Sequence, residues 1–62
     1  MNREYDIFLL FPNGTPVLLD HVQGLQTVHE QLAILSKMTK NECFAQHAES
    51  KEVVARVNVK GK

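Results

Sequence analysis

The chain is poor in the residues that build disulfide frameworks, zinc fingers and membrane spans. It has one cysteine, Cys43, and three histidines scattered over 62 residues. One cysteine cannot form an intramolecular disulfide, and the histidine spacing does not match a zinc finger. The longest apolar run, Ile7 to Phe11, has five residues, whereas a membrane-spanning helix needs about 20. We therefore expect a small soluble globular domain without a metal site and without contact with a membrane.

The chain also lacks an excess of charge of either sign. Seven basic and seven acidic side chains give a formal net charge of zero. Such a chain has no positive field of the kind that supplies most non-specific affinity for nucleic acid, so a nucleic-acid partner is disfavoured. The first six residues contain two acids and no signal-peptide stretch, which favours a cytoplasmic location. A chain of this size buries only about 60% of its unfolded surface, so association with a second chain is an expected source of stability.

A β-hairpin is predicted at the N-terminal end. Residues 5–11 are rich in β-branched and aromatic types, and residues 12–16 are dense in turn formers. An Asn-Gly pair between two apolar runs is the strongest short-range hairpin signal, and the second strand is then 17–22. Pairing the strands about Asn13 and Gly14 makes the numbers of cross-strand partners add to 27.

This register makes both faces of the hairpin apolar. One face receives Tyr5, Ile7, Leu9, Phe11, Leu18 and Val22, with Asp20 as its one acid. The other receives Phe8, Leu10, Val17 and Leu19, with Asp6 opposite His21 near the open end. An antiparallel sheet with one solvated face is apolar on the other face alone, so this hairpin is predicted to be covered on both sides.

An amphipathic helix of about four turns is predicted next, with Gly24 as its N-cap and Asn41 as its stop. Its apolar stripe consists of Leu25, Val28, Leu32 and Leu35, and this stripe is expected to cover one face of the hairpin. Ile34 and Met38 lie outside the stripe. They are either ordinary exposed residues or part of a contact with another chain.

Two more strands are predicted after the helix, over 42–48 and 53–59, joined by a polar turn at 49–52. In the last strand one face receives Val53, Ala55, Val57 and Val59, and the other receives Val54, Arg56 and Asn58. The chain is therefore predicted to be a single α+β domain over residues 1–62. Its expected order is ββαββ, with one helix on one face of a small antiparallel sheet of four strands whose spatial order stays open.

No pattern of residues predicts catalysis, a cofactor or a metal ion, so we expect the protein not to be an enzyme. His21 facing Asp6 would form half of a relay, but no nucleophile is placed beside the pair. Cys43 and His47 would lie about 13 Å apart on a strand, too far to share a tetrahedral ion. Cys43 is expected to be a small buried apolar residue.

The end of the chain is locally basic. Four of the five charged residues from position 51 onward are basic, namely Lys51, Arg56, Lys60 and Lys62. Two interpretations are open: a solvated edge strand protected by charge, or a weak site for an anionic partner.

Several segments resemble a group of very short hypothetical bacterial proteins. They are YDIF (5–8), FPNGTPV (11–17), VQGL (22–25) and KNECFA (40–45). The resemblance covers most of the chain and implies a bacterial, cytoplasmic protein, without implying an activity. The sequence is also similar to HicB-like antitoxin domains, in which a hairpin runs into a helix led by Gly-Leu. It departs from them by lacking the third strand that precedes their helix.

The expected function follows from the second apolar face of the hairpin, for which the chain offers no second helix. We expect two chains to bury Phe8, Leu10, Val17 and Leu19 against each other in a homodimer, with Ile34 and Met38 as further candidates for a contact with a partner protein. This predicts a non-enzymatic protein-interaction or regulatory module. The alternatives are a nucleic-acid-associated regulator that uses the basic C-terminal strand, and a small-ligand binder with its pocket at the dimer interface.

Overall fold

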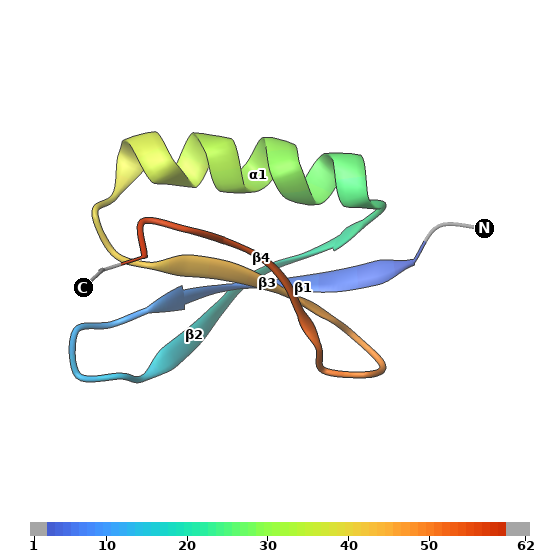
Figure 1. Cartoon of the computed structure of the whole chain (residues 1–62), viewed down its shortest axis with the longest axis horizontal. Helices are drawn as coiled ribbons and strands as arrows, with labels where there is room; N and C mark the ends of the chain where they lie inside the picture. The colour runs from blue at the N-terminus through green and yellow to red at the C-terminus, as the bar shows by residue number, and fades with distance from the viewer. Residues whose placement is uncertain (1–2, 60–62) are drawn as a thin grey trace.

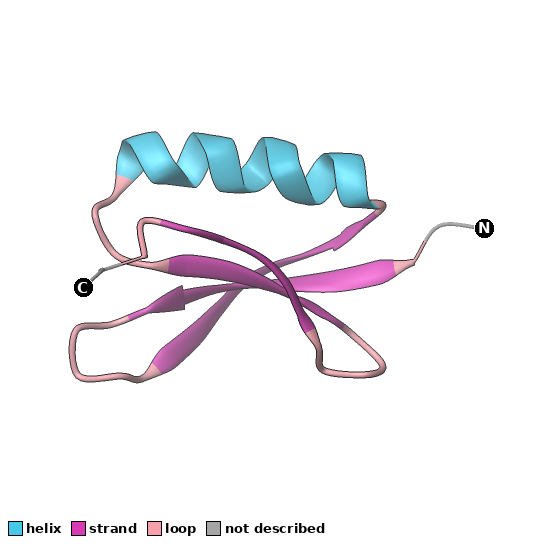
Figure 2. Ribbon diagram, viewed as in Figure 1, coloured by secondary structure: helices cyan, strands magenta, loops and turns pink. Residues whose placement is uncertain are grey.

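The computed structural model describes residues 3–59 of the chain. Its elements are β1 (Glu4–Leu10), β2 (Pro16–Gln23), α1 (Leu25–Met38), β3 (Cys43–His47) and β4 (Val53–Val57) (Figure 2). The four strands form one sheet in the order β2-β1-β3-β4, and all three neighbouring pairs are antiparallel. The predicted α+β class and the ββαββ order are confirmed.

The helix lies across one face of the sheet (Figure 1). No other element within residues 3–59 covers the opposite face, which we call the open face. Because β1 and β3 are the central strands, residues of the hairpin and of the C-terminal half lie side by side on it.

The register of β1 against β2 changes within the hairpin. From Glu4 opposite Gln23 to Ile7 opposite Asp20, partner numbers add to 27 as predicted, whereas from Phe8 onward they add to 26. The length of the turn explains why the partner numbers add to 26 near it. Phe11 N–H donates to Thr15 O at 2.9 Å, so three residues form the loop, and Gly14 adopts the positive φ of 91° that such loops require. Leu19 is the extra residue of a β-bulge that restores the predicted register.

This change of register corrects four predicted positions at the turn end of the hairpin. Val17 lies opposite Leu9, which packs against the core, so Val17 belongs to the helix side of the sheet. Leu18 lies opposite Phe8 on the open face, and its side chain is 57% exposed. Leu19, predicted opposite Phe8, has no partner on β1. Phe11, predicted on the helix side, lies at the start of the turn and is exposed.

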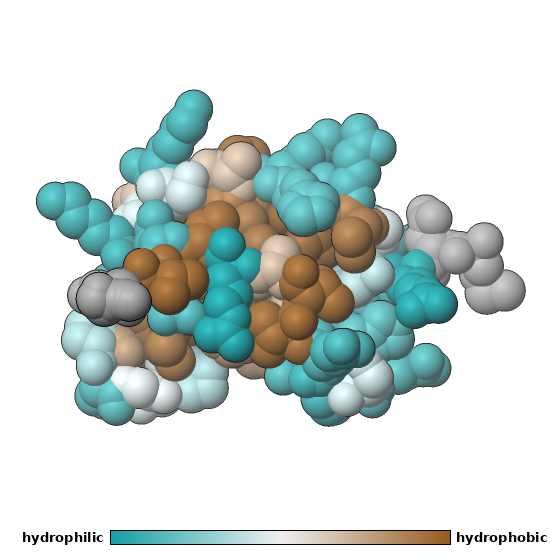
Figure 3. Space-filling view, viewed as in Figure 1, coloured by the Kyte–Doolittle hydropathy of each residue, from teal (hydrophilic) through white to brown (hydrophobic). Residues whose placement is uncertain are grey.

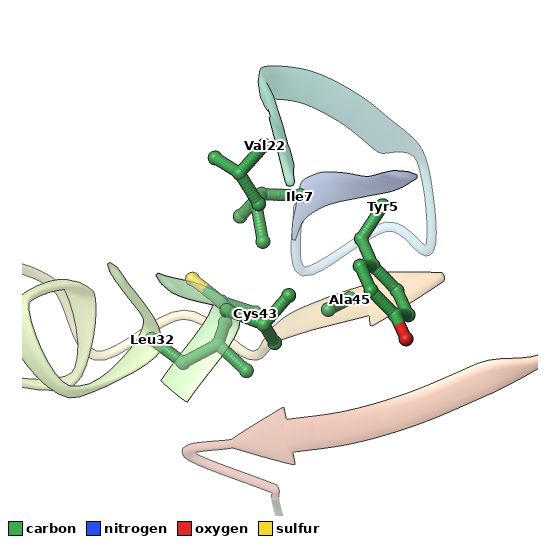
Figure 4. Close-up of a cluster of buried hydrophobic side chains, with 7 residues drawn as sticks. Tyr5, Ile7, Val22, Leu32, Cys43 and Ala45 are labelled. Carbon is green, nitrogen blue, oxygen red and sulfur yellow. The ribbon is translucent and has the colours of Figure 1, made fainter. Parts of the chain in front are cut away.

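The core lies between α1 and the helix side of the sheet. Its buried side chains are Tyr5, Ile7, Val22, Val28, Leu32, Cys43 and Ala45, and Figure 4 shows side chains of the sheet and of Leu32 converging. The predicted burial of Val28, Leu32 and Cys43 is confirmed. Leu25 is 43% exposed, contrary to the prediction, because it is the first residue of α1, where the chain leaves the edge strand β2.

The helix begins after Gly24, as predicted, and ends at Met38, earlier than the predicted stop. Asn58 fixes the loop that follows the helix. Its Nδ2 donates to Thr39 O at 2.8 Å and to Asn41 O at 3.1 Å. The backbone of Asn58 has a φ of 57°, a left-handed conformation that asparagine tolerates better than most residues. The end of β4 is thereby tied to the C-terminal end of α1.

The alternation predicted for the last strand holds for Ala55 and Val57, which pack against the core. A register shift between Ala45 and Gln46 places Val53 opposite Gln46, so Val53 leaves that alternating series. Val59 lies beyond β4 and is exposed.

Candidate functional site

The open face carries a group of apolar side chains at its centre. Phe8 lies between Leu18 on β2 and Phe44 on β3 in one row across the sheet. The two phenyl rings are stacked, with centroids 5.2 Å apart and an interplanar angle of 19°. Leu10 follows on the same face, two residues after Phe8. We call Phe8, Leu10, Leu18 and Phe44 the apolar patch.

The patch is accessible to a partner. Leu18 is exposed, and the other three residues are half-buried. Figure 3 has the same view as Figure 1 and looks onto the edge of the sheet, where apolar atoms also reach the surface below the helix. Aromatic and leucine side chains that are only half covered by their own chain are typical of a surface that meets another protein.

A cluster of three ionisable side chains borders the patch at the open end of the hairpin. Asp6 and His21 are direct cross-strand partners, and the imidazole Nδ1 lies 2.6 Å from Asp6 Oδ1. The other ring nitrogen, Nε2, lies 3.0 Å from Glu4 Oε1. These hydrogen bonds, the one to Asp6 first and the one to Glu4 second, raise the pKa of His21 above 6.5.

The geometry of this cluster suits an ion triad. In a catalytic relay one ring nitrogen faces a carboxylate and the other faces the nucleophile. Here both nitrogens of His21 are engaged by carboxylates, so neither is left to deprotonate a nucleophile. The predicted pairing of His21 with Asp6 is confirmed, and Glu4 is a third member that the sequence analysis missed.

The basic candidates do not form one basic site among the described residues. Arg56 lies opposite Phe44 on the open face, and its Nη1 donates to Glu42 Oε2 at 3.3 Å. Lys51 lies in the β3–β4 turn with a φ of 66°. Lys60 and Lys62 lie outside the described residues. The pairing of Arg56 with a carboxylate leaves less positive charge at this strand for an anionic partner.

The helix residues singled out as possible contacts lie on a separate surface. Ile34 is 52% exposed and Met38 is 75% exposed. Both belong to α1, which covers the face opposite to the apolar patch. The structure therefore does not combine Ile34 and Met38 with Phe8 and Leu10 into one continuous interface.

Cys43 and His47, the remaining candidates for a chemical role, both have structural roles. Burial, with a smaller contribution from the charge of Glu42, raises the pKa of the Cys43 thiol, which therefore stays protonated at neutral pH. His47 Nδ1 accepts the N–H groups of Glu49 and Ser50 at 3.3 and 3.2 Å and so holds the β3–β4 turn. Within residues 3–59 no three His, Cys, Asp or Glu side chains are arranged to hold a metal ion.

A shallow pocket lies at the end of the sheet near the β1–β2 turn. Its lining consists of Leu10, Phe11, Pro12, Gly14, Asn41 and Glu42. The Glu42 carboxylate already binds Arg56. Among the described side chains, no buried polar atom lacks a hydrogen-bond partner. The other polar side chain of the lining is Asn41.

Three members of the open face were missed by sequence reasoning. Leu18 was placed on the wrong side because the loop length was taken as two residues. Phe44 alternates with Cys43 and Ala45, and this pattern places it on the far face of a strand. Its place beside Phe8 depends on the strand order. Glu4 lies two residues before Asp6, a spacing that puts both on one face.

Comparison with protein-family models, with curated proteins and with solved structures finds no match to this chain. The resemblance to short bacterial proteins and to HicB-like domains stays a prediction. In the described part of the chain, α1 is too short and too polar to cross a bilayer.

Proposed function

We propose that the protein is a small non-enzymatic interaction or regulatory module that acts as a homodimer, in which two chains pack the open faces of their sheets together. The observation that carries the proposal is the apolar patch on a sheet face that no described element covers. A two-fold interface needs one self-complementary surface, and an apolar patch centred on two stacked rings meets that requirement. Sheets that pack face to face lie about 10 Å apart, with their inner side chains interdigitated.

The area of the open face can be compared with the area that a dimer interface needs. Four strands about 4.8 Å apart, each of five or more residues at about 3.4 Å per residue, give a projected area of roughly 300 Å². Side chains that stand on the face, such as Phe8 and Leu18, raise the accessible area above this projection. A specific interface needs about 500 Å² of accessible surface on each partner. The projected area lies below this value, and the protruding side chains bring the accessible area of the open face closer to it.

The energetics favour a second copy as well. Full burial of one large apolar side chain contributes about 1.5–3 kcal/mol, and the patch has four such residues in each chain. A core of this size supplies no more than about 3–5 kcal/mol of net stability. Leu18 is exposed, whereas Phe8, Leu10 and Phe44 are already partly buried, so covering the patch contributes only a fraction of this value for each residue, about 1–4 kcal/mol in each chain. We further propose a cytoplasmic location, which the single, buried and unpaired thiol of Cys43 supports.

The proposal is tested by the mass of the protein in solution over a concentration series. We expect the wild type to reach about 14 kDa, twice the chain mass of 7.0 kDa. Leu18→Lys should reduce the mass to that of one chain, because it places a charge in the patch. Ile34→Lys is the matched control, since Ile34 is similarly exposed but lies on α1.

Two outcomes would overturn the proposal. One is a wild type that stays at the mass of one chain at every concentration up to the millimolar range. The other is a dimer that Ile34→Lys dissociates and Leu18→Lys leaves intact, which would place the interface on the helix.

A further inference from the structure

We infer that the Glu4–His21–Asp6 cluster regulates association through the open face, with two chains associating more tightly when His21 is protonated. This inference rests on the proposed dimer. The cluster lies beside the apolar patch on the open face.

The β-bulge brings the cluster and the patch together on one face. Leu18 and His21 are three residues apart, and in a regular strand such residues point to opposite faces. With Leu19 as the extra residue, Leu18 lies opposite Phe8 while His21 lies opposite Asp6. On β1, Asp6 and Phe8 are two residues apart, so their side chains share a face at about 7 Å along the strand. A surface that covers Phe8 and Leu18 thus also reaches Asp6 and His21.

Covering the cluster removes water from its charges. With His21 protonated, the imidazolium lies between two carboxylates and donates to both, and the cluster has a net charge of −1. With His21 neutral, the charge is −2, and one ring nitrogen turns a lone pair toward a carboxylate. Loss of water is most unfavourable for carboxylates without a counter-charge. A dimer that dehydrates the cluster therefore favours the protonated form.

Within residues 3–59, the charged partners of the His21 side chain are both acids, and Gln46, which lies opposite Asp6 on β3, is uncharged. From β1 His21 faces Asp6 and Glu4, and on its own strand Asp20 Oδ1 accepts the backbone N–H of His21 at 2.8 Å. The Gln23 amide donates to the second oxygen of Glu4 at 3.5 Å. β2 is an edge strand, and α1 lies on the other face. The hydrogen bonds to Asp6 and Glu4 raise the pKa of His21 above 6.5, so the change in charge falls above that pH.

The test is the dissociation constant of the dimer, measured by sedimentation equilibrium at pH 6.0 and pH 8.5. We expect the wild type to dissociate about tenfold more readily at the higher pH. His21→Gln should show the same constant at both pH values within about twofold. His29→Gln is the matched control, because His29 is exposed on α1, and it should keep the pH dependence of the wild type.

The outcomes separate this inference from the proposed dimer. A dimer with the same constant at both pH values, or with a pH dependence that His21→Gln keeps, would overturn the inference and leave the dimer standing. A monomer at both pH values would overturn the dimer itself. A second readout needs no variant: the pKa of His21, followed by NMR, should be higher at millimolar than at micromolar chain concentration, and equal values would overturn the inference.

Discussion

The phenyl rings of Phe8 and Phe44 stack at a centroid distance of 5.2 Å on the side of the sheet that α1 does not cover. The two residues come from opposite halves of the chain and are brought together by the pairing of β1 with β3. A stacked aromatic pair contributes about 0.5–1.5 kcal/mol beyond the burial of its area. Both rings are already partly buried in one chain, so a partner gains the burial of the part of each ring that is still exposed.

The register of the hairpin predicts a difference between two neighbouring residues. Val17→Asp should lower the free energy of unfolding by about 1–2 kcal/mol, because Val17 is half-buried opposite Leu9. Leu18→Asp should change it by no more than about 0.5 kcal/mol, because Leu18 is exposed. The measurement is urea denaturation at a chain concentration low enough for the monomer to predominate. A larger cost for Leu18→Asp would contradict the observed register.

Asn58 and Asn13 both form side-chain hydrogen bonds, but Asn→Asp is predicted to lower the stability at Asn58 and to leave it nearly unchanged at Asn13. Asn58 acts as a donor to two carbonyl oxygens, so Asn58→Asp places a carboxylate against both and should cost about 2 kcal/mol or more. Asn13 acts as an acceptor, since its Oδ1 receives the N–H of Thr15 at 3.0 Å. Asn13→Asp keeps that acceptor and should change stability by less than about 0.5 kcal/mol.

Thermal or urea denaturation of the two Asn→Asp variants checks this pair. Equal losses of stability would mean that Asn58 does not hold the loop after α1. Asn58→Gly tests the side chain separately from the backbone conformation. Glycine adopts the left-handed φ without strain and lacks the amide that donates the two hydrogen bonds.

The ion triad predicts a specific titration. The pKa of His21 should lie above 6.5, and Asp6→Asn should lower it more than Glu4→Gln, because the bond to Asp6 has the larger effect. A pKa raised in the folded state contributes stability that is complete below the pKa of the unfolded chain and is lost as the pH rises through the folded value. The free energy of unfolding should therefore fall as the pH rises above 6.5.

NMR titration of the imidazole gives the pKa directly, and denaturation at several pH values gives the stability. A value of 6.5 or lower for His21 would contradict the two hydrogen bonds. A fall in stability of the same size in His21→Gln would assign the effect to another group.

The fold class could be predicted because its signals are local. The helix has its apolar residues at helical spacing, and the hairpin has its turn formers between two apolar runs. The loop length could not be predicted from Asn13 and Gly14 alone, because an Asn-Gly pair fits both two-residue and three-residue loops. The bulge at Leu19 has no local signal, since an apolar residue in an apolar strand does not indicate that it lacks a partner.

The open face was predictable only in part. Phe8 and Leu10 were assigned to an uncovered face because alternation along β1 is regular. Phe44 joins them through the pairing of β1 with β3, which depends on contacts between residues far apart in sequence. The three-residue loop is the reason that Leu18, and not Val17, lies on the open face.

Intermolecular nuclear Overhauser effects would show whether two chains meet through their open faces. The sample is an equal mixture of isotope-labelled and unlabelled wild-type chains at a concentration where the dimer predominates. We expect intermolecular contacts from the methyl groups of Leu10 and Leu18 to the rings of Phe8 and Phe44. Intermolecular contacts confined to Ile34 and Met38, or none at all, would contradict the proposed dimer.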